Sequence, residues 1–301
     1  MPNPKQTEAP PWTILNILKW TTSYFTSHNV ENPRASAEIL LAHVLGVKRI
    51  DLYIRYDQPL IPAELSRFKA TIRRRVRREP VAYIVGEREF WSMPIAVTPD
   101  VLIPRPETEC LVETALATLS SGPGEHQGAP TGILELGTGS GAVVLALAAE
   151  LKKAVFTATD RSLRAIAVAR RNARRFSLEP RIRFFCGDWF ACLRPQGLHF
   201  DMILSNPPYI PTAEIDRLQP EVARYEPRGA LDGGADGLTS IRAIIGRAHH
   251  YLRSGGYLLL EIGYDQKADI ESLAGEHSTY VQLDFIRDYS GHDRVVRLLR
   301  K

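Results

Sequence analysis

Hydrophobic positions in the first quarter of the chain recur with helical spacing. From about residue 12 to residue 78, apolar side chains three and four positions apart predict a small helical unit. Asn32 followed by Pro33 is expected to cap and open one of its helices, and Gly46 is expected to end it. Pro62 is expected to open a further helix that runs to about residue 78.

The spacing changes after this unit. Between Glu87 and Ile103 the apolar residues predict a short β-hairpin that joins two domains. The stretch Ser120–Pro130 is rich in glycine, proline and serine, so we expect a flexible loop there.

From Thr131 onward, short apolar runs alternate with helical periodicity. Helices are expected at Ala142–Leu151, Ser162–Phe176 and Leu238–Leu252, and strands at Ile133–Leu136, Ala154–Thr159, Ile182–Cys186, Phe200–Leu204 and Tyr257–Ile262. This alternation predicts an α/β fold with a parallel, doubly wound sheet. The last two strands, about Tyr280–Arg287 and Arg294–Leu299, are joined by the short link Asp288–His292. They are therefore expected to form a hairpin, which places an antiparallel strand in the sheet.

The composition is that of an ordinary globular protein. Hydrophobic residues make up 44% and charged residues 24% of 301 residues, enough for two domains. Three cysteines without CxxC spacing argue against a disulfide framework or a zinc site and fit a reducing cytoplasm. The longest apolar run, Ala142–Ala149, is too short to span a bilayer, and the polar start is not a signal peptide. We therefore expect a cytoplasmic protein without a metal site or membrane contact.

The net charge of +4 permits an acidic or nucleic-acid partner without requiring one. Basic residues gather on the predicted helix 62–78, where they would either steer such a partner or form a solvated face. The chain has no recognisable base-reading domain, so no stable binding of nucleic acid is expected.

A glycine-rich turn lies between the first strand and the first helix of the α/β region. It reads Gly137-Thr138-Gly139-Ser140-Gly141, and no Gly-Lys-Ser/Thr follows, so it is not a Walker A loop. Glycines at such a turn let a ligand approach the backbone and the helix N-terminus. The turn favours a nucleotide-type cofactor, with a purely structural turn as the alternative.

Acidic and aromatic residues follow the next two strands. Asp160 is placed to hydrogen-bond a ribose diol, although it could instead cap the following helix. Asp188 could accept from an adenine amino group or serve a turn, and Trp189 could pack on the adenine ring or in the core. NAD and S-adenosylmethionine both carry this ribose, so these residues do not separate the two cofactors.

The fourth strand ends in Ser205-Asn206-Pro207-Pro208-Tyr209. The two prolines hold the backbone rigid and lack N–H groups, so the Asn206 side-chain oxygen and the Pro207 carbonyl remain as acceptors. Two acceptors and the flat face of Tyr209 suit a planar –NH2 group. A hydride-transfer site needs no such pair, whereas methyl transfer to an amide or an aromatic amine does. This motif therefore favours S-adenosylmethionine as the cofactor.

Further motifs are spread along nearly the whole chain, namely Glu79-Pro-Val-Ala-Tyr-Ile84, Leu102-Ile-Pro-Arg-Pro-Glu-Thr-Glu109, Glu135-Leu-Gly-Thr-Gly-Ser-Gly141, Gly187-Asp-Trp-Phe190, Ser205-Asn-Pro-Pro-Tyr-Ile210, Glu226-Pro227 with Ala230-Leu231, and Leu260-Glu-Ile-Gly263. Together they resemble the motifs of HemK-type protein-(glutamine-N5) methyltransferases. The resemblance implies a class I S-adenosylmethionine-dependent methyltransferase fold with an added N-terminal helical domain. It implies a helical substrate-recognition domain at 1–84, a hairpin linker at 85–106 and a catalytic domain at 107–301.

The resemblance also implies a substrate and roles for residues. The substrate would be the glutamine of the Gly-Gly-Gln motif in class 1 peptide chain release factors. Residues 137–141, Asp160 and Trp189 would hold the cofactor, and Asp188 is a further candidate from its own position in the chain. Residues 206–209 would hold the glutamine amide, with Asn206, Pro207 and Tyr209 at the reaction and Asn206 also near the methyl donor.

Other functions remain open at this stage. A sister group methylates a glutamine of a large-subunit ribosomal protein but usually differs at Pro104-Arg-Pro-Glu-Thr-Glu109. Methyltransferases of exocyclic amino groups in nucleic-acid bases share Asn-Pro-Pro-Tyr, and a binding module without enzymatic activity is a further alternative. The segment Pro211–Gly237 is expected to form a substrate-facing flap, and Glu135 stands where many relatives carry aspartate.

Overall fold

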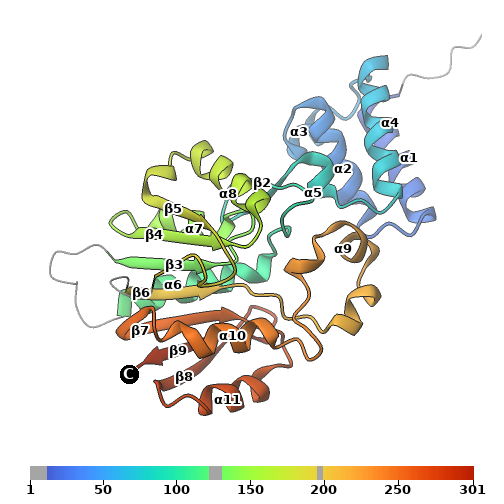
Figure 1. Cartoon of the computed structure of the whole chain (residues 1–301). Coiled ribbons are helices and arrows are strands. Elements are labelled where there is room, and N and C mark those ends of the chain that lie inside the picture. The colour runs from blue at the N-terminus through green and yellow to red at the C-terminus, as the bar shows by residue number, and fades with distance from the viewer. Residues whose placement is uncertain (1–11, 122–130, 195–198) are drawn as a thin grey trace, which may run out of the picture. The chain divides into compact units, whose positions relative to one another are not determined.

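The computed structural model describes residues 12–121, 131–194 and 199–301, and the chain divides into two units, Met1–Gly86 and Glu87–Lys301 (Figure 1). The expectations for the N-terminal end and for residues 122–130 of the glycine-rich loop lie outside the described residues. Ser120 and Ser121 of that expected loop are instead the last residues of a helix. Within the described part of the chain, no helix combines the length and apolar character needed to cross a membrane.

The first unit is a cluster of helices, as expected. These are α1 (Ile14–Ser27), α2 (Pro33–Leu45), α3 (Arg49–Ile54), α4 (Pro62–Val76) and α5 (Val81–Val85). Their apolar faces meet in one core, in which Phe25, Leu40 and Leu41 are completely buried. Gly46 ends α2 in a left-handed conformation, as expected. Asn32 precedes α2 but makes no capping hydrogen bond, because its backbone is left-handed rather than extended.

The second unit is built on a seven-stranded sheet with the order β5-β4-β3-β6-β7-β9-β8. The strands are β3 (Gly132–Leu136), β4 (Val155–Asp160), β5 (Ile182–Cys186), β6 (Phe200–Ser205), β7 (Leu252–Glu261), β8 (Tyr280–Arg287) and β9 (Asp293–Arg300). Strands β3 to β7 pair in parallel, and β9 is antiparallel to both of its neighbours. The predicted doubly wound sheet with an antiparallel last strand is thereby confirmed.

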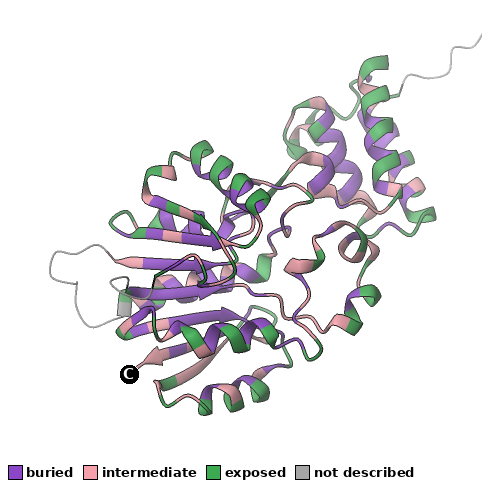
Figure 2. Ribbon diagram, viewed as in Figure 1, coloured by how far each residue is buried: buried purple, intermediate pink, exposed green. Residues whose placement is uncertain are grey.

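Helices cover both faces of this sheet (Figure 1). They are α6 (Glu109–Ser121), α7 (Ala142–Glu150), α8 (Leu163–Arg175), α10 (Thr239–Ala248) and α11 (Lys267–Gly275). Neighbouring strand residues point to opposite faces, so Ile133 packs in the core under α6 and α7 while Leu134 packs in the core under α10. Figure 2 shows the central strands as largely buried. The sheet is therefore a rigid platform whose strand ends carry loops.

The expected helix Leu238–Leu252 is shorter in the structure. The helix α10 ends at Ala248, and Leu252 already belongs to β7, where it pairs with Phe200 of β6. The register between β6 and β7 shifts after Phe200, and Gly255 has a left-handed backbone at this irregularity. Periodicity alone could not separate helix from strand here because Ala248, Tyr251 and Leu252 continue the helical spacing of the buried residues.

The hairpin consists of β1 (Glu87–Phe90) and β2 (Met93–Ala96). Phe90 and Ile95 are buried in the core of the larger unit, and Asn172 of α8 hydrogen-bonds both the N–H and the carbonyl of Ala96. The hairpin thus belongs structurally to the second unit. The division into 1–84, 85–106 and 107–301 stays a prediction.

The segment expected to be a flap contains short helices. These are η3 (Thr212–Arg217), α9 (Pro220–Tyr225) and η4 (Arg228–Ala230), and a further short helix, η1 (Pro106–Thr108), precedes α6. A bridge between Ile210 and Asp232 closes the segment into a loop. Its role toward a substrate stays a prediction.

Candidate functional site

A cavity of about 790 Å³ lies at the carboxyl ends of the central parallel strands. It is lined by many of the residues expected from the sequence, namely Gly137, Thr138, Gly139, Ser140, Asp160, Asp188, Trp189, Asn206 and Pro208. Gly141, Pro207 and Tyr209 are not among its lining residues. The Ser205 hydroxyl donates to the Leu136 carbonyl at 2.7 Å, which fixes the ends of β3 and β6 beside each other. The glycine turn and Asn206 therefore share one cavity.

The glycine turn has the backbone that its composition predicts. Gly137 and Gly139 have φ values of 70° and 54°, in the left-handed region that favours glycine. A Cβ atom on Gly139 would meet nothing within 4 Å, so that side of the turn is open. Gly141 differs, because its Cβ would lie 3.2 Å from that of Ala169. Gly141 thus serves close packing between α7 and α8, and the turn before it faces the cavity.

Asp160 is held in place by the backbone around it. Its Oδ2 accepts from the Gly139 N–H at 2.9 Å, and its Oδ1 accepts from the Ser162 N–H at 2.8 Å. The helix α8 is capped by Ser162, whose hydroxyl accepts from the Ala165 N–H. The alternative that Asp160 is the helix cap is therefore wrong. Burial raises the pKa of Asp160, and each oxygen keeps a lone pair for a further donor.

Glu135 begins the glycine-rich motif, and the sequence alone assigned it no role in the site. It lines the cavity, is almost completely buried, and its carboxyl accepts a hydrogen bond from the Thr138 hydroxyl. Burial raises its pKa to about 8, so it is largely protonated at neutral pH. The sequence did contain a signal, because Glu135 is an acid within the otherwise apolar strand β3.

Trp189 is half-buried and lies between the cavity and the core. It lines the cavity and packs against the apolar core under α10. Its φ of 47° is unusual for a residue other than glycine, and its ring lies 3.5 Å from where a Gly137 Cβ would be. Asp188 is exposed at the same cavity, and its carbonyl accepts from the Ala191 N–H in a turn. This geometry is compatible with Asp188 binding adenine or serving only the turn, and with Trp189 packing on the adenine ring or only in the core.

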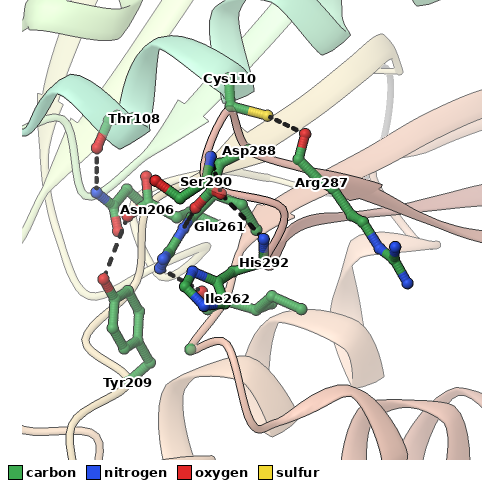
Figure 3. A network of polar contacts seen from close by, with 12 residues as sticks. Thr108, Cys110, Asn206, Tyr209, Glu261, Ile262, Arg287, Asp288, Ser290 and His292 are labelled. Atoms are coloured by element: carbon green, nitrogen blue, oxygen red, sulfur yellow. Dashed lines mark hydrogen bonds and ion pairs between the residues drawn. The ribbon is translucent and has the colours of Figure 1, made fainter.

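Asn206 presents a free acceptor. Its Nδ2 donates to the hydroxyl of Thr108 at 3.1 Å (Figure 3). Among the described residues, no donor reaches its Oδ1 atom or the carbonyl of Pro207. The Asn206 oxygen is therefore free at the cavity, whereas Pro207 is buried and does not line it, so the expected contact of its carbonyl with an –NH2 group stays a prediction.

The hydroxyl of Tyr209 points into the protein. It donates to Oε1 of Glu261 at 3.3 Å, and burial together with the Glu261 charge raises the pKa of Tyr209 (Figure 3). The structure does not place the Tyr209 ring on the cavity wall, so its expected contact with an –NH2 group stays a prediction. Glu261 is buried at the end of β7, and burial raises its pKa to about 7.

Contacts beyond the motif hold its last residues in position. The Ile210 N–H donates to the Leu231 carbonyl at 3.1 Å, and the Gly233 N–H donates to the Ile210 carbonyl at 2.8 Å. The Tyr209 carbonyl accepts from Gln266 Nε2 at 3.1 Å. These contacts leave the loop little freedom to shift.

Glu226 joins two sequence motifs that are far apart in the chain. Its Oε2 accepts from the Ile103 N–H at 3.0 Å, and its Oε1 accepts from the Arg105 guanidinium. The Glu226 side chain is almost completely buried, whereas Arg105 also lines the cavity. The Pro-Arg-Pro stretch and Glu226-Pro227 thus form one wall of the site.

Both units of the chain match families of known proteins. The model of the PrmC N-terminal domain matches residues 16–86, and the model of the methyltransferase small domain matches residues 118–219. The release factor glutamine methyltransferase of Geobacter sulfurreducens is 44% identical over 96% of this chain and 98% of its own length. That of Moorella thermoacetica is 43% identical over 96% of this chain and 99% of its own length.

A solved structure with a similar fold is the hMettl16 catalytic domain in complex with MAT2A 3′UTR hairpin 6. It matches with a TM-score of 0.56 at 16% identity, over 73% of this chain and 80% of that chain. At this identity the likeness concerns the fold alone.

Proposed function

This chain belongs to the release factor glutamine methyltransferases, and we propose that it transfers a methyl group from S-adenosylmethionine to the side-chain amide nitrogen of a glutamine. The glutamine is that of the Gly-Gly-Gln motif in class 1 peptide chain release factors. The doubly wound sheet with its antiparallel last strand is the class I methyltransferase fold.

The observation that carries this proposal is the free acceptor at Asn206, beside which we expect the Pro207 carbonyl to act as a second acceptor. The Asn206 Nδ2 is bound by Thr108, so its Oδ1 is the atom left for a ligand in the cavity. A primary amide carries two N–H donors in one plane, which this oxygen and the Pro207 carbonyl are suited to accept. The pair supports an amide nitrogen as the methyl acceptor.

The cavity suits a nucleoside cofactor. Its volume of about 790 Å³ lies in the usual range for small-molecule sites. The open side of the turn at Gly139 lets a ligand approach the backbone, and Asp160 is oriented by two backbone N–H groups toward a ribose diol. Trp189 offers an aromatic surface for adenine. When bound, S-adenosylmethionine supplies an electrophilic methyl carbon.

The residues around Asn206 act mainly by orientation. An amide nitrogen is a poor nucleophile because its lone pair is delocalised into the carbonyl group. Two acceptors on its hydrogens hold the nitrogen out of conjugation and aim the lone pair at the donor. The nitrogen loses a proton once it has gained the methyl group, and this proton is acidic enough to leave without a strong base.

The test is label transfer to a release factor. The protein is incubated with methyl-labelled S-adenosylmethionine and a class 1 release factor, either intact or with Gln→Ala in its Gly-Gly-Gln motif. Label on the intact factor alone is the expected result, and equal labelling of both overturns the proposal. A ribosomal protein and a nucleic acid are included as further substrates, and label on either of these in place of the release factor also overturns it.

A further inference from the structure

Glu261 is a buried acid that the proposed reaction does not use. It ends β7 directly after the apolar residues Leu258–Leu260 and is 1% exposed. It lies under the loop that carries Asn206 and Tyr209, and it is not among the residues lining the cavity. Its Oε2 atom is buried without a hydrogen-bond partner among the described residues. A buried carboxyl group in such a place requires an explanation.

Both polar side chains of the Asn-Pro-Pro-Tyr motif connect to this carboxyl group. Tyr209 donates to it directly, and Asn206 donates to the Thr108 hydroxyl (Figure 3). Hydrogen bonding by the Thr108 hydroxyl in turn favours the charged form of Glu261. Thr108 is itself buried. The four side chains come from η1 (Thr108), the loop after β6 (Asn206 and Tyr209) and β7 (Glu261), so the network connects three separate elements.

The charge of Glu261 determines the direction of these hydrogen bonds. An ionised carboxylate can only accept, so the hydroxyls that face it must donate. Once the Thr108 hydroxyl has given its single proton to Glu261, its oxygen is left to accept from Asn206. The Asn206 amide then directs its NH2 group to Thr108 and its oxygen to the cavity.

We propose that Glu261 is a positioning residue that sets the orientation of the Asn206 amide through Thr108, and that its ionisation favours methyl transfer. The proposal rests on the proposed function, because it concerns how the same acceptor is held. A protonated Glu261 can donate to Thr108, and the Thr108 proton is then free to point at Asn206. That arrangement favours the reversed amide, with NH2 in the cavity, where it cannot accept from the substrate.

Polar and charged groups around Glu261 have opposing effects on its pKa. Arg294 on β9 favours the charged form, and Glu107 on η1 disfavours it. Tyr209 favours the charged form by its hydrogen bond. The Glu261 charge contributes, after burial, to the raised pKa of the Cys110 thiol at the start of α6. Burial is the largest influence, and together they raise the pKa of Glu261 to about 7. A change of pH across neutrality therefore tests the idea.

The first experiment measures single-turnover methylation of a saturating release factor between about pH 6 and pH 8.5. The wild-type rate is expected to rise through the ionisation of Glu261, because the amide substrate does not titrate there. Glu261→Gln is expected to be about 10- to 100-fold slower at pH 8, to lack the rise, and to bind S-adenosylmethionine normally. Glu271→Gln, an exposed glutamate on α11, is the matched control and keeps both rate and profile.

A Glu261→Gln variant that keeps the wild-type rate and pH profile overturns the proposal. Since a buried substitution can impair folding, Thr108→Val and Thr108→Ser form a second pair. Valine has the shape of threonine but no hydroxyl, so it should slow methylation, and serine should restore most of the loss. Equal rates for the valine and serine variants also overturn the proposal.

A second measurement separates this inference from the proposed function. In the protein without any substrate, the side-chain amide NMR signals of Asn206 should shift with a midpoint near pH 7 and remain constant in Glu261→Gln. Signals that ignore pH in the wild type contradict the role of Glu261, whatever the substrate proves to be. Absence of label on the release factor, with the NMR shift present, contradicts the proposed function alone.

Discussion

A carboxamide can present either its oxygen or its NH2 group to a cavity, and at Asn206 the contact with Thr108 decides between them. Because Nδ2 is engaged at 3.1 Å, the oxygen is the group left for a ligand. A second acceptor, the Pro207 carbonyl, follows in the chain without a donor among the described residues. At the scale of single residues, the Asn206 and Pro207 oxygens therefore lack a donor, while the NH2 group of Asn206 is already hydrogen-bonded to Thr108.

Replacing Asn206 tests this reading most directly. Asn206→Ala removes one acceptor and leaves a substrate N–H unpaired, which costs about 1–3 kcal/mol before any misalignment. We expect turnover to be lost and affinity for S-adenosylmethionine to be largely kept, as measured by rate assays and by titration. Asn16→Ala on α1, where the residue is exposed, serves as the control. Near-normal turnover in Asn206→Ala would contradict the role of Asn206.

Asp160 is expected to show the opposite pattern. Asp160→Asn keeps the size of the side chain but replaces one acceptor oxygen by a donor, next to the N–H groups of Gly139 and Ser162. Affinity for S-adenosylmethionine should fall by about tenfold or more, because a hydrogen bond to a charged group contributes about 1.5–3 kcal/mol. The rate at saturating cofactor should change much less. Titration and saturation kinetics check this against Asp269→Asn on α11, and equal affinities would refute it.

At the scale of elements, the loop after β6 is held by the segment that returns to it. The backbone of Gly237 has a φ of 76°, and a Cβ there would lie 2.4 Å from the Tyr209 carbonyl. Gly255 has a similar φ of 74° with nothing within 4 Å of its Cβ position. Substitutions at these two glycines therefore distinguish the effect of backbone strain from the effect of displacing the Asn-Pro-Pro-Tyr motif.

Alanine at each of these glycines makes a matched pair. Both substitutions should lower the free energy of unfolding by about 1–2 kcal/mol, because alanine is strained in a left-handed conformation. Only Gly237→Ala should also slow methylation, since it pushes the Tyr209 carbonyl and with it the loop from Asn206 onward. Urea denaturation and single-turnover rates measure the two effects. A similar loss of rate in Gly255→Ala would show that strain alone is responsible.

The elements themselves were predictable where they are long or repeat a pattern. The strands β3, β4, β5 and β6 follow from short apolar runs between helical stretches, because alternation of this kind has few other solutions. The helix α9 was missed because six residues span less than two turns and carry almost no periodicity. The contact from Glu226 to Ile103 joins residues 123 positions apart and leaves no local signal.

At the scale of the whole molecule, the sheet order explains why the sequence located the centre of the cavity, although not most of its lining. Parallel strands end at the same edge, so residues that directly follow β3, β4 and β6 gather there without any further information. Thr108 lines the cavity from η1, which does not follow a strand of this sheet, and Glu261 lies beneath the loop and does not line the cavity. Both residues lie in motifs that carry the family resemblance, Leu102–Glu109 and Leu260–Gly263, but the motifs did not indicate their roles. For Glu261 a further signal is its place as an acid at the end of an apolar strand.

Two buried acids of the larger unit, Glu135 and Glu261, have raised pKa values that also make its stability depend on pH. Burial raises the pKa of Glu135 to about 8 and that of Glu261 to about 7, whereas both titrate near 4.5 when unfolded. Between pH 5 and the folded-state pKa, the unfolded chain binds fewer protons than the folded chain. The free energy of unfolding therefore falls as pH rises, by up to about 1.4 kcal/mol per pH unit for each group.

Glu135→Gln should flatten this fall in urea denaturation between about pH 5.5 and 7.5, relative to the wild type and to Glu271→Gln. The comparison of slopes cancels the contribution of other groups such as His249, whose lowered pKa acts in the opposite direction. If the slope of Glu135→Gln equals that of the wild type, Glu135 is already charged in the folded protein, and the neutral acid beneath the glycine turn is refuted.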